Sequence, residues 1–433
     1  MLRCSLTATV MLFVGFTPGF VLAALPKEGH VAVQLRAQET NEWCWASSGQ
    51  MVMAFLSKKV TQCDEADQRF GRTDCCGAST PIDCIRGGWP EFDKYGFTFA
   101  VKHGALTWDE LRTEIATNRR PFAFSWMWRQ GGGHMMVVTG FYEGPQQKQY
   151  VSINDPWPPN IGDERDILYD AFVEGADHTH WDDYYLVARE QPGSAKNQKD
   201  SVKDEGSNNK DSKDKSSKKA PSRPRGGVVA LPNKEKDVAS SIPVAFKTAL
   251  TESHAIAEDS VAEYREIAAR KEGPGAANMN YSIGQPFPQV FVGLEDLRGA
   301  PIGEPDSIIR RESSKVLYPI QADGVRAAVT IAKKDDHWEP ISFGNKALMR
   351  LLVDIRAKYA KENDIELSDF YTVAIPALNL HFVATDKDSG RDATLISVID
   401  DRKLKIVAGK PEKASDLMPR LIEAAKQHDG LPR

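Results

Sequence analysis

The segment NEWCWASSGQMVMAFLSKK, residues 41–59, decides the expected fold of the first half of the chain. Its apolar residues recur at helical spacing, and Thr40 and Asn41 are residue types that cap helix N-termini. We therefore expect a helix capped by Thr40 or Asn41, with Cys44 in its first turn. The positive end of a helix dipole favours the thiolate form of a cysteine placed there, and the thiolate attacks carbonyl groups.

Strand-like segments follow this predicted helix. They are FAFSWMW at 122–128, HMMVVTGFY at 134–142 and QYVSIND at 149–155, separated by glycine-containing turns. β-Branched and aromatic residues between such turns are typical of strands. Ahead of them, Thr107 and Glu110 have the spacing of a helix capping box. Helices followed by an antiparallel sheet predict an α+β fold.

Two residues of these strands could serve as partners for Cys44. His134 begins one strand and Asp155 ends the next, which is strand spacing within a hairpin. A carboxylate there can accept a hydrogen bond from the second ring nitrogen and so fix the tautomer of the histidine. Asn154, next to Asp155, leaves the identity of this third residue open. The glycines at 131–133 leave room for a substrate backbone beside the ring.

Gln38 completes the candidate constellation. It lies six residues before Cys44, and its side-chain amide could donate to an oxyanion beside the backbone N–H of Cys44. Each residue also has a simpler interpretation: Cys44 as a buried thiol between two tryptophans, Asp155 as a turn residue before proline, and Gln38 as a polar loop residue. The joint order Gln, Cys, His, Asp favours catalysis.

Gln38-x5-Cys44-Trp45-Ala46-Ser47 resembles the active-site helix of papain-like cysteine proteases, with their oxyanion glutamine, nucleophile and following tryptophan. GGGHMMVVTGFY and INDP resemble the His and Asp strands of bacterial members, which include staphopains, bacteriocin-processing peptidase domains and secreted effector proteases of plant pathogens. The resemblance covers about residues 38–185. It implies a papain-like fold, peptide-bond hydrolysis through an acyl-thioester, and no cofactor. The sequence departs from papain in having Glu42-Trp43 before the cysteine and Asp155 in place of asparagine.

Residues 1–23 have the pattern of a secretory signal peptide, with Arg3, an apolar stretch and a cleavage position near Ala23. The alternative, a membrane anchor, is disfavoured because the stretch is short and interrupted. The remaining five cysteines agree with export to the periplasm or beyond. Four of them lie together and can form two disulfides in an oxidising compartment, which leaves Cys44 as a free thiol. That group is expected to form two disulfides, with a zinc site as the alternative; its members are Cys63, Cys75, Cys76 and Cys84. Adjacent cysteines rarely pair, so Cys63 should join one of them and Cys84 the other.

The chain is long enough for more than one domain. We expect a papain-like domain at 25–192, a disordered linker rich in Lys, Ser and Asp at 193–243, and a separate α+β domain at 244–433. The last domain is expected to hold helices near 244–269, 345–361 and 415–427. Its expected strands include a hairpin at 325–334 and 337–343 and a strand at 403–409. Its role stays open between substrate docking, anchoring and covering the cleft, so intramolecular regulation is one alternative.

A formal net charge of −5 gives no reason to expect nucleic acid or a membrane as partner, and the expected partner is a protein or peptide substrate. His178 and His180 are metal-ligand types, but a structural role is favoured over a metal site. The same triad would also serve other acyl transfers, such as transglutamination or peptidoglycan amide hydrolysis. A catalytically dead binding or inhibitor protein is the alternative from a different class.

Overall fold

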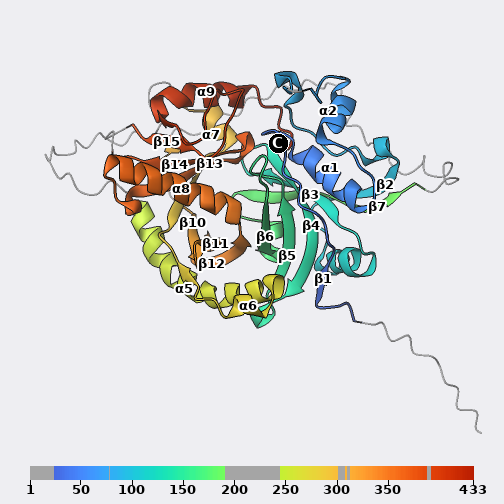
Figure 1. Ribbon diagram of the computed structural model, residues 1–433, viewed down its shortest axis with the longest axis horizontal. Coiled ribbons are helices and arrows are strands. Elements are labelled where there is room, and N and C mark those ends of the chain that lie inside the picture. The colour runs from blue at the N-terminus through green and yellow to red at the C-terminus, as the bar shows by residue number, and fades with distance from the viewer. Residues whose placement is uncertain (1–23, 78, 191–243, 301–307, 310–312, 388–391) are drawn as a thin grey trace, which may run out of the picture.

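The computed structural model describes residues 24–77, 79–190, 244–300, 308–309, 313–387 and 392–433. The predicted signal peptide and linker lie outside these residues. The described residues form one large mixed sheet covered by helices (Figure 1). The mixed α and β content agrees with the prediction. Strands from both predicted domains belong to the same sheet, and the structure does not confirm a separate C-terminal domain.

The order of strands along the sheet is β16-β15-β14-β13-β9-β10-β11-β12-β6-β5-β4-β3-β7-β2, with β1 beside β4 and β8 beside β10. The strands are β1 (Glu28–His30), β2 (Phe97–His103), β3 (Phe122–Trp128), β4 (Gly133–Glu143), β5 (Gln149–Asp155), β6 (Asp163–Leu168), β7 (His178–Arg189), β8 (Ser282–Ile283), β9 (Phe287–Phe291), β10 (Lys315–Gln321), β11 (Val325–Lys334), β12 (His337–Gly344), β13 (Phe370–Ile375), β14 (Leu380–Thr385), β15 (Thr394–Ser397) and β16 (Pro411–Lys413).

The helices are α1 (Cys44–Phe55), α2 (Gln62–Phe70), α3 (Trp108–Arg112), α4 (Tyr169–Val173), α5 (Val244–Glu272), α6 (Pro274–Ala277), α7 (Leu294–Arg298), α8 (Lys346–Asn363) and α9 (Ala414–Lys426). In the described part of the chain, no helix combines the length and the hydropathy that crossing a bilayer requires.

Strand β4 is buried on both faces, which explains its almost unbroken apolar sequence. Met135 and Val137 pack with α1, whereas Met136 and Val138 belong to the core shared with the C-terminal region. Successive side chains of a strand point to opposite faces, so β4 is covered by α1 on one side and by C-terminal elements on the other.

The two halves of the sheet join where β6 pairs antiparallel with β12, and Gly344 lies opposite Arg165 in that register. Next to this junction, Oδ2 of Asp163 accepts hydrogen bonds from the backbone N–H groups of Ala347 and Leu348, at 2.9 and 3.1 Å. A carboxylate of the first half thereby caps α8 of the second half. Burial raises the pKa of Asp163 to about 6.

The predicted cap of the cysteine helix is wrong. Helix α1 begins at Cys44 itself, and the N-cap residue Trp43 makes no side-chain capping bond. The Asn41 amide donates instead to the Asp401 carboxylate of the C-terminal region, at 2.7 Å. A long-range contact has therefore taken the side chain that the local sequence offers for capping.

A strand predicted at 403–409 is also wrong. Lys405 has a φ of 55°, and the Asp401 carboxylate accepts from the backbone N–H of Leu404, so a tight turn replaces the strand. The capping box of Thr107 and Glu110 is confirmed at the start of α3. The hairpin of β11 and β12 and the three strands β3, β4 and β5 are likewise confirmed.

Candidate active site

Cys44 is the first residue of α1 and is fully buried between α1 and β4. The first backbone N–H groups of a helix have no partner inside the helix, so they are available to an anion at this position. The backbone N–H of Met135 donates to Sγ of Cys44 at 3.3 Å. Cys44 is the free cysteine of the described residues, which keeps its sulfur available for reaction.

His134 lies at the start of β4 and contacts both other members of the predicted triad. Its Nε2 is 2.7 Å from Oδ1 of Asp155, and its ring lies close enough to Cys44 for the charges of the two groups to interact. Burial by itself lowers the pKa of His134, but the charges of Asp155 and Cys44 outweigh that effect and raise it to about 10. This arrangement favours an imidazolium beside the sulfur.

Asp155 is held by three donors at the end of β5. Besides His134, it accepts from the backbone N–H of Trp157 at 2.9 Å and forms an ion pair with Arg165. Burial raises the pKa of Asp155, but the charges of His134 and Arg165 hold it below the usual value. The neighbouring Asn154 points elsewhere and donates to the backbone oxygen of Val33 at 3.2 Å. Of the two adjacent candidates, Asp155 is therefore the one that contacts the histidine.

Gln38 is buried. Its backbone N–H donates to the oxygen of Pro156 at 2.9 Å, which places it next to the end of β5 that carries Asp155. Its side-chain Nε2 donates to the backbone oxygen of Thr40 at 2.8 Å, and its Oε1 has no partner among the described residues. In this arrangement the amide nitrogen is engaged by Thr40. The oxyanion role of Gln38 stays a prediction.

The tryptophans on either side of Cys44 hold the segment 84–86 at one side of the site, a contact that the sequence analysis did not predict. The indole of Trp43 donates to the oxygen of Cys84 at 2.8 Å, and that of Trp45 donates to the oxygen of Arg86 at 3.0 Å. These bonds fix the segment 84–86 beside the start of α1. Gly87 and Gly88 follow directly.

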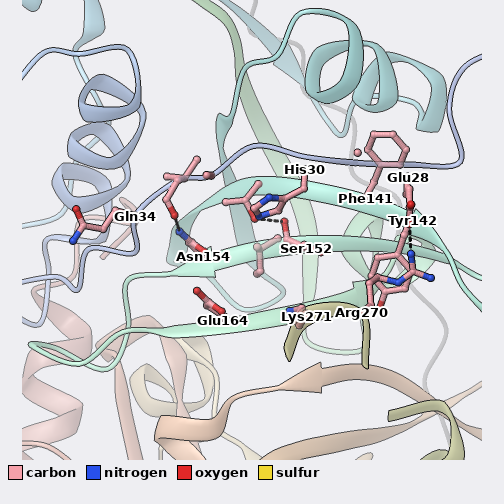
Figure 2. A pocket seen from close by; sticks show the side chains of 15 residues that line it. Glu28, His30, Gln34, Phe141, Tyr142, Ser152, Asn154, Glu164, Arg270 and Lys271 are labelled. Atoms are coloured by element: carbon pink, nitrogen blue, oxygen red, sulfur yellow. Dashed lines mark hydrogen bonds and ion pairs between the residues drawn. The ribbon is translucent and has the colours of Figure 1, made fainter. Parts of the chain in front are cut away.

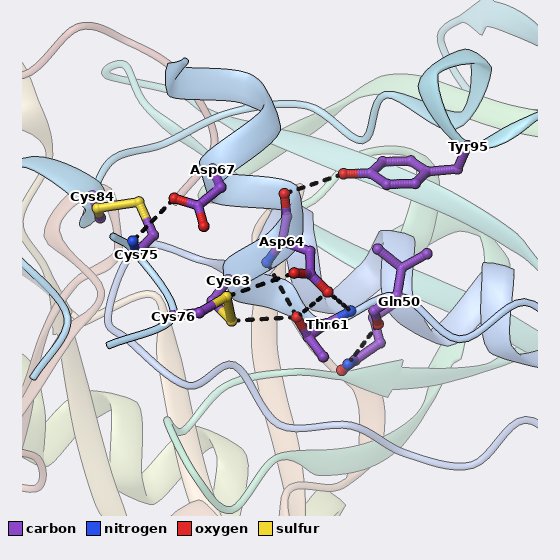
Figure 3. The surroundings of a disulfide bond; sticks show 10 residues. Gln50, Thr61, Cys63, Asp64, Asp67, Cys75, Cys76, Cys84 and Tyr95 are labelled. Atoms are coloured by element: carbon purple, nitrogen blue, oxygen red, sulfur yellow. Dashed lines mark hydrogen bonds between the residues drawn. A yellow bond between two sulfur atoms is a disulfide. The ribbon is translucent and has the colours of Figure 1, made fainter. Parts of the chain in front are cut away.

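Disulfides stabilise the same segment (Figure 3). Cys63 pairs with Cys76, and Cys75 pairs with Cys84. The groups of potential metal ligands in the described residues both include these cysteines, whose sulfurs are already bonded to each other. The pairing therefore favours disulfides over the zinc alternative.

The two histidines of β7 have protein partners that account for them. Nε2 of His178 lies 3.0 Å from the backbone oxygen of Ala171, and Nε2 of His180 lies 2.8 Å from the Asp183 carboxylate. Both rings also pack against aromatic side chains of β3. These contacts support the structural role that the sequence favoured.

The C-terminal region covers the triad. The indole of Trp157 donates to the oxygen of Asn379 at 3.2 Å, and its ring lies edge-on to that of His381, with centroids 4.6 Å apart. A small cavity of about 130 Å³ is left between these residues, His134 and Asp155. Burial lowers the pKa of His381 to about 4, so this ring is neutral near pH 7.

A larger cavity of about 800 Å³ lies away from the triad, where α5 approaches β1, β4 and β5 (Figure 2). Its lining includes His30, Ser152 and Lys271, and an ion pair joins Glu28 to Arg270 across it. None of the triad residues lines this cavity, so its size does not make it the centre of the predicted chemistry.

A buried free cysteine at a helix start, next to a histidine that a carboxylate orients, is the arrangement of a cysteine peptidase of the papain-like class. Residues 27–167 match the family described as papain-like cysteine protease AvrRpt2. The match contains Cys44, His134 and Asp155 and spans about a third of the chain. The predicted resemblance is confirmed for this part, and the matching family implies a cysteine peptidase, which is a hydrolase. No curated protein matches the chain significantly.

Proposed function

We propose that this chain is a secreted cysteine peptidase in which Cys44 is the nucleophile, His134 the general base and acid, and Asp155 the residue that orients His134. The observation that supports it most is the convergence of the three side chains. The ring of His134 lies beside Cys44, whose sulfur accepts from the backbone N–H of the next residue, Met135, and Nε2 of His134 lies 2.7 Å from Oδ1 of Asp155. The match to a papain-like protease family over residues 27–167 supports the same class of reaction.

The reaction then follows from the positions of these groups. The Cys44 sulfur adds to a peptide carbonyl carbon, and the negative oxygen is held by the N–H of Cys44 and the amide of Gln38. His134 gives its proton to the departing amine, which leaves an acyl-thioester on Cys44. Water next loses a proton to His134 and adds to the thioester. The acid product leaves, and the sulfur is regenerated.

Export and regulation complete the proposal. The pattern of residues 1–23 and the two disulfides are typical of proteins in oxidising compartments. Intramolecular regulation by residues 244–433 is supported by the contacts of Asn379 and His381 with Trp157. A covering unit of this kind has to move before a substrate reaches Cys44.

The Cys44→Ala variant tests the proposal. The backbone oxygen of Arg433 lies 3.1 Å from Nδ1 of His134, so the assay uses the chain lacking Leu431–Arg433. We expect this chain to cleave fluorescently labelled casein, and the same chain with Cys44→Ala to lose at least about 10³-fold in rate. Its melting temperature should stay close to that of the parent. Casein cleavage at a comparable rate by the Cys44→Ala chain would refute the proposal. Incorporation of a fluorescent amine without cleavage would show transglutamination instead.

A further inference from the structure

The last residues of the sequence run through the groove beside the triad. Leu431–Arg433 lies between Gly87–Gly88 on one side and Gly133–His134 on the other, and Figure 1 shows the end of the chain next to the start of α1. This segment comes from the C-terminal region, directly after α9. It occupies the space that a substrate peptide needs in order to reach Cys44.

Main-chain bonds hold this segment on both sides. The N–H of Gly88 donates to the oxygen of Pro432 at 3.1 Å, and the N–H of Arg433 donates to the oxygen of Gly133 at 3.0 Å. Pro432 and Gly133 form a parallel β-bridge. Extended peptides are commonly bound through main-chain bonds of this kind, with side-chain pockets supplying specificity.

The carbonyl group of Arg433 lies at the catalytic histidine. Its oxygen is 3.1 Å from Nδ1 of His134, whereas Nε2 of the same ring is bound to Asp155. His134 is the proposed donor of the proton to the departing amine, so a residue whose carbonyl group lies beside this ring is next to the position of the scissile bond. Pro432 and Leu431 then take the two preceding places.

The groove fits a backbone closely at Gly87. A Cβ atom added there would lie 2.6 Å from the oxygen of Pro432 and 3.1 Å from Cβ of Leu431. Any side chain at this position would collide with the segment. The absence of a side chain is therefore what allows Leu431–Arg433 to pass so near the wall.

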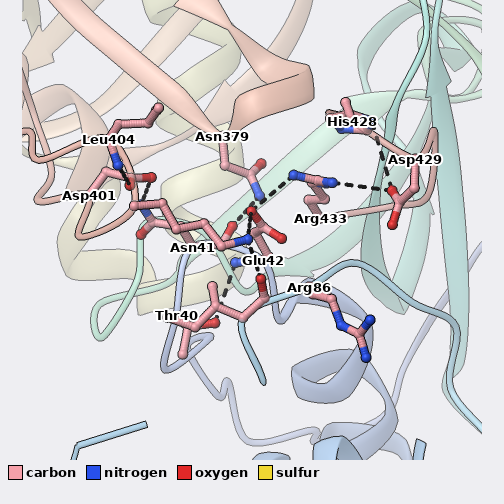
Figure 4. A network of polar contacts seen from close by, with 12 residues as sticks. Thr40, Asn41, Glu42, Arg86, Asn379, Asp401, Leu404, His428, Asp429 and Arg433 are labelled. Atoms are coloured by element: carbon pink, nitrogen blue, oxygen red, sulfur yellow. Dashed lines mark hydrogen bonds and ion pairs between the residues drawn. The ribbon is translucent and has the colours of Figure 1, made fainter. Parts of the chain in front are cut away.

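The side chain of Arg433 meets a buried carboxylate two residues before the nucleophile (Figure 4). Its Nη1 is 2.9 Å from Oε1 of Glu42, and both residues are buried. The Oε2 atom of Glu42 has no partner in the described part of the chain. The remaining partners of this pair come from the C-terminal region: Lys403 contacts Glu42 at 2.9 Å, and Asp429 contacts Arg433 at 3.2 Å.

A buried carboxylate is stabilised by a cation that reaches it. The guanidinium of arginine offers two terminal nitrogens, and in Arg433 one of them contacts Glu42 and the other contacts Asp429. Burial raises the pKa of Glu42, and the charges of Arg433 and Lys403 oppose that effect. Removal of Leu431–Arg433 takes Arg433 away from Glu42 and leaves its place beside Lys403 open to an arginine of the substrate.

We propose that this groove takes extended peptides with arginine just before the scissile bond and proline before that, that Glu42 selects the arginine, and that Leu431–Arg433 holds the site as an intramolecular occupant of the same kind. This inference rests on the proposed peptidase function. The alternative is that Leu431–Arg433 only joins the two regions of the chain. That role would need the Glu42–Arg433 ion pair but not the main-chain hydrogen bonds to Gly88 and Gly133.

Peptide substrates test the selection of arginine. The chain lacking Leu431–Arg433 is assayed with the coumarin amides of acetyl-Leu-Pro-Arg and acetyl-Leu-Pro-Gln, and with labelled casein. We expect kcat/KM for the arginine peptide to exceed that for the glutamine peptide by about 10²-fold. In the same chain with Glu42→Gln, the ratio should fall below about tenfold, while Cys44 remains reactive toward iodoacetamide.

A second measurement keeps the test independent of how well the Glu42 variant folds. Free acetyl-Leu-Pro-Arg should inhibit casein cleavage by the chain lacking Leu431–Arg433 that keeps Glu42. Its inhibition constant should be at least about tenfold lower than that of acetyl-Leu-Pro-Gln. Equal constants would overturn the proposal. The proposal would also be overturned if the enzyme cleaved casein but had nearly equal kcat/KM values for the arginine and glutamine peptides. A ratio of these two values that Glu42→Gln left unchanged would overturn it as well. Either result would leave the peptidase function intact. If neither casein nor any peptide is cleaved, the proposed function fails and the specificity fails with it.

Discussion

The residues before 190 and those after 244 contribute to the same cleft in different ways. The first part supplies the proposed reactive groups, of which His134 and Asp155 lie 21 residues apart in sequence. The second part supplies the occupant of the cleft, and the pair that holds it, Glu42 and Arg433, lies 391 residues apart. The proposed histidine–aspartate pair therefore comes from neighbouring strands of one hairpin, whereas the contacts proposed to control access span almost the whole chain.

The largest expected effect sharpens the catalytic side of this comparison. Asp155→Ala should lower kcat/KM by about 10³-fold, because His134 loses the carboxylate that orients it and stabilises its charge. The adjacent Asn154→Ala is the matched control, because Asn154 contacts Val33 instead of the histidine. Its rate should stay within about threefold of the parent. Kinetics on labelled casein measure both; equal losses would mean that Asp155 has no special role.

The next prediction concerns cleavage of the chain by itself. The dipeptide Pro-Arg occurs at 224–225, 419–420 and 432–433. If the groove selects it, incubation of the chain lacking Leu431–Arg433 should produce a cut after Arg225. Pro419 and Arg420 lie inside helix α9, and a helical backbone does not fit an extended groove, so this site is the internal control. Mass spectrometry of the fragments locates the cuts. Cuts spread evenly over the lysines of 193–243 would contradict the proposed specificity.

A smaller effect is expected on stability. The pKa of His134 is raised from about 6.5 in the unfolded chain to about 10 in the folded chain. The folded state then binds more protons between these values, so this contribution is complete below pH 6.5 and is lost as the pH rises toward 10. The melting temperature of the parent should therefore fall by a few degrees more than that of His134→Gln over this range. Parallel curves from scanning calorimetry would contradict the raised pKa.

The candidate site was predictable from the sequence because it depends on residue type and local spacing, whereas the catalytic roles of its residues stay a prediction. A cysteine at a predicted helix start, a histidine at a strand start and an aspartate at the end of the next strand define Cys44, His134 and Asp155 without knowledge of the fold. The hairpin geometry of β4 and β5 then brings the last two together. The capping box at Thr107 was readable for the same reason, since it is a local bond.

Features that depend on distant contacts were not readable. The cap of α1 was mispredicted because the Asn41 amide donates a hydrogen bond to Asp401, and no local sequence pattern predicts that contact. Arg165 was missed because β6 gives a weak strand signal and its role depends on lying beside Asp155. The wall at Gly87 and Gly88 was missed because it is placed by the indoles of Trp43 and Trp45, about 40 residues earlier. In each case the partner is set by tertiary packing.

The reactivity of Cys44 toward iodoacetamide tests the central claim most directly, with the full chain compared against the chain lacking Leu431–Arg433. The Cys44→Ala chain gives the background, because the other cysteines of the described residues are paired. If the last residues fill the groove above the sulfur, their removal should raise the alkylation rate by at least about tenfold. Equal rates would contradict the account, because they would show that Leu431–Arg433 does not control access to the nucleophile.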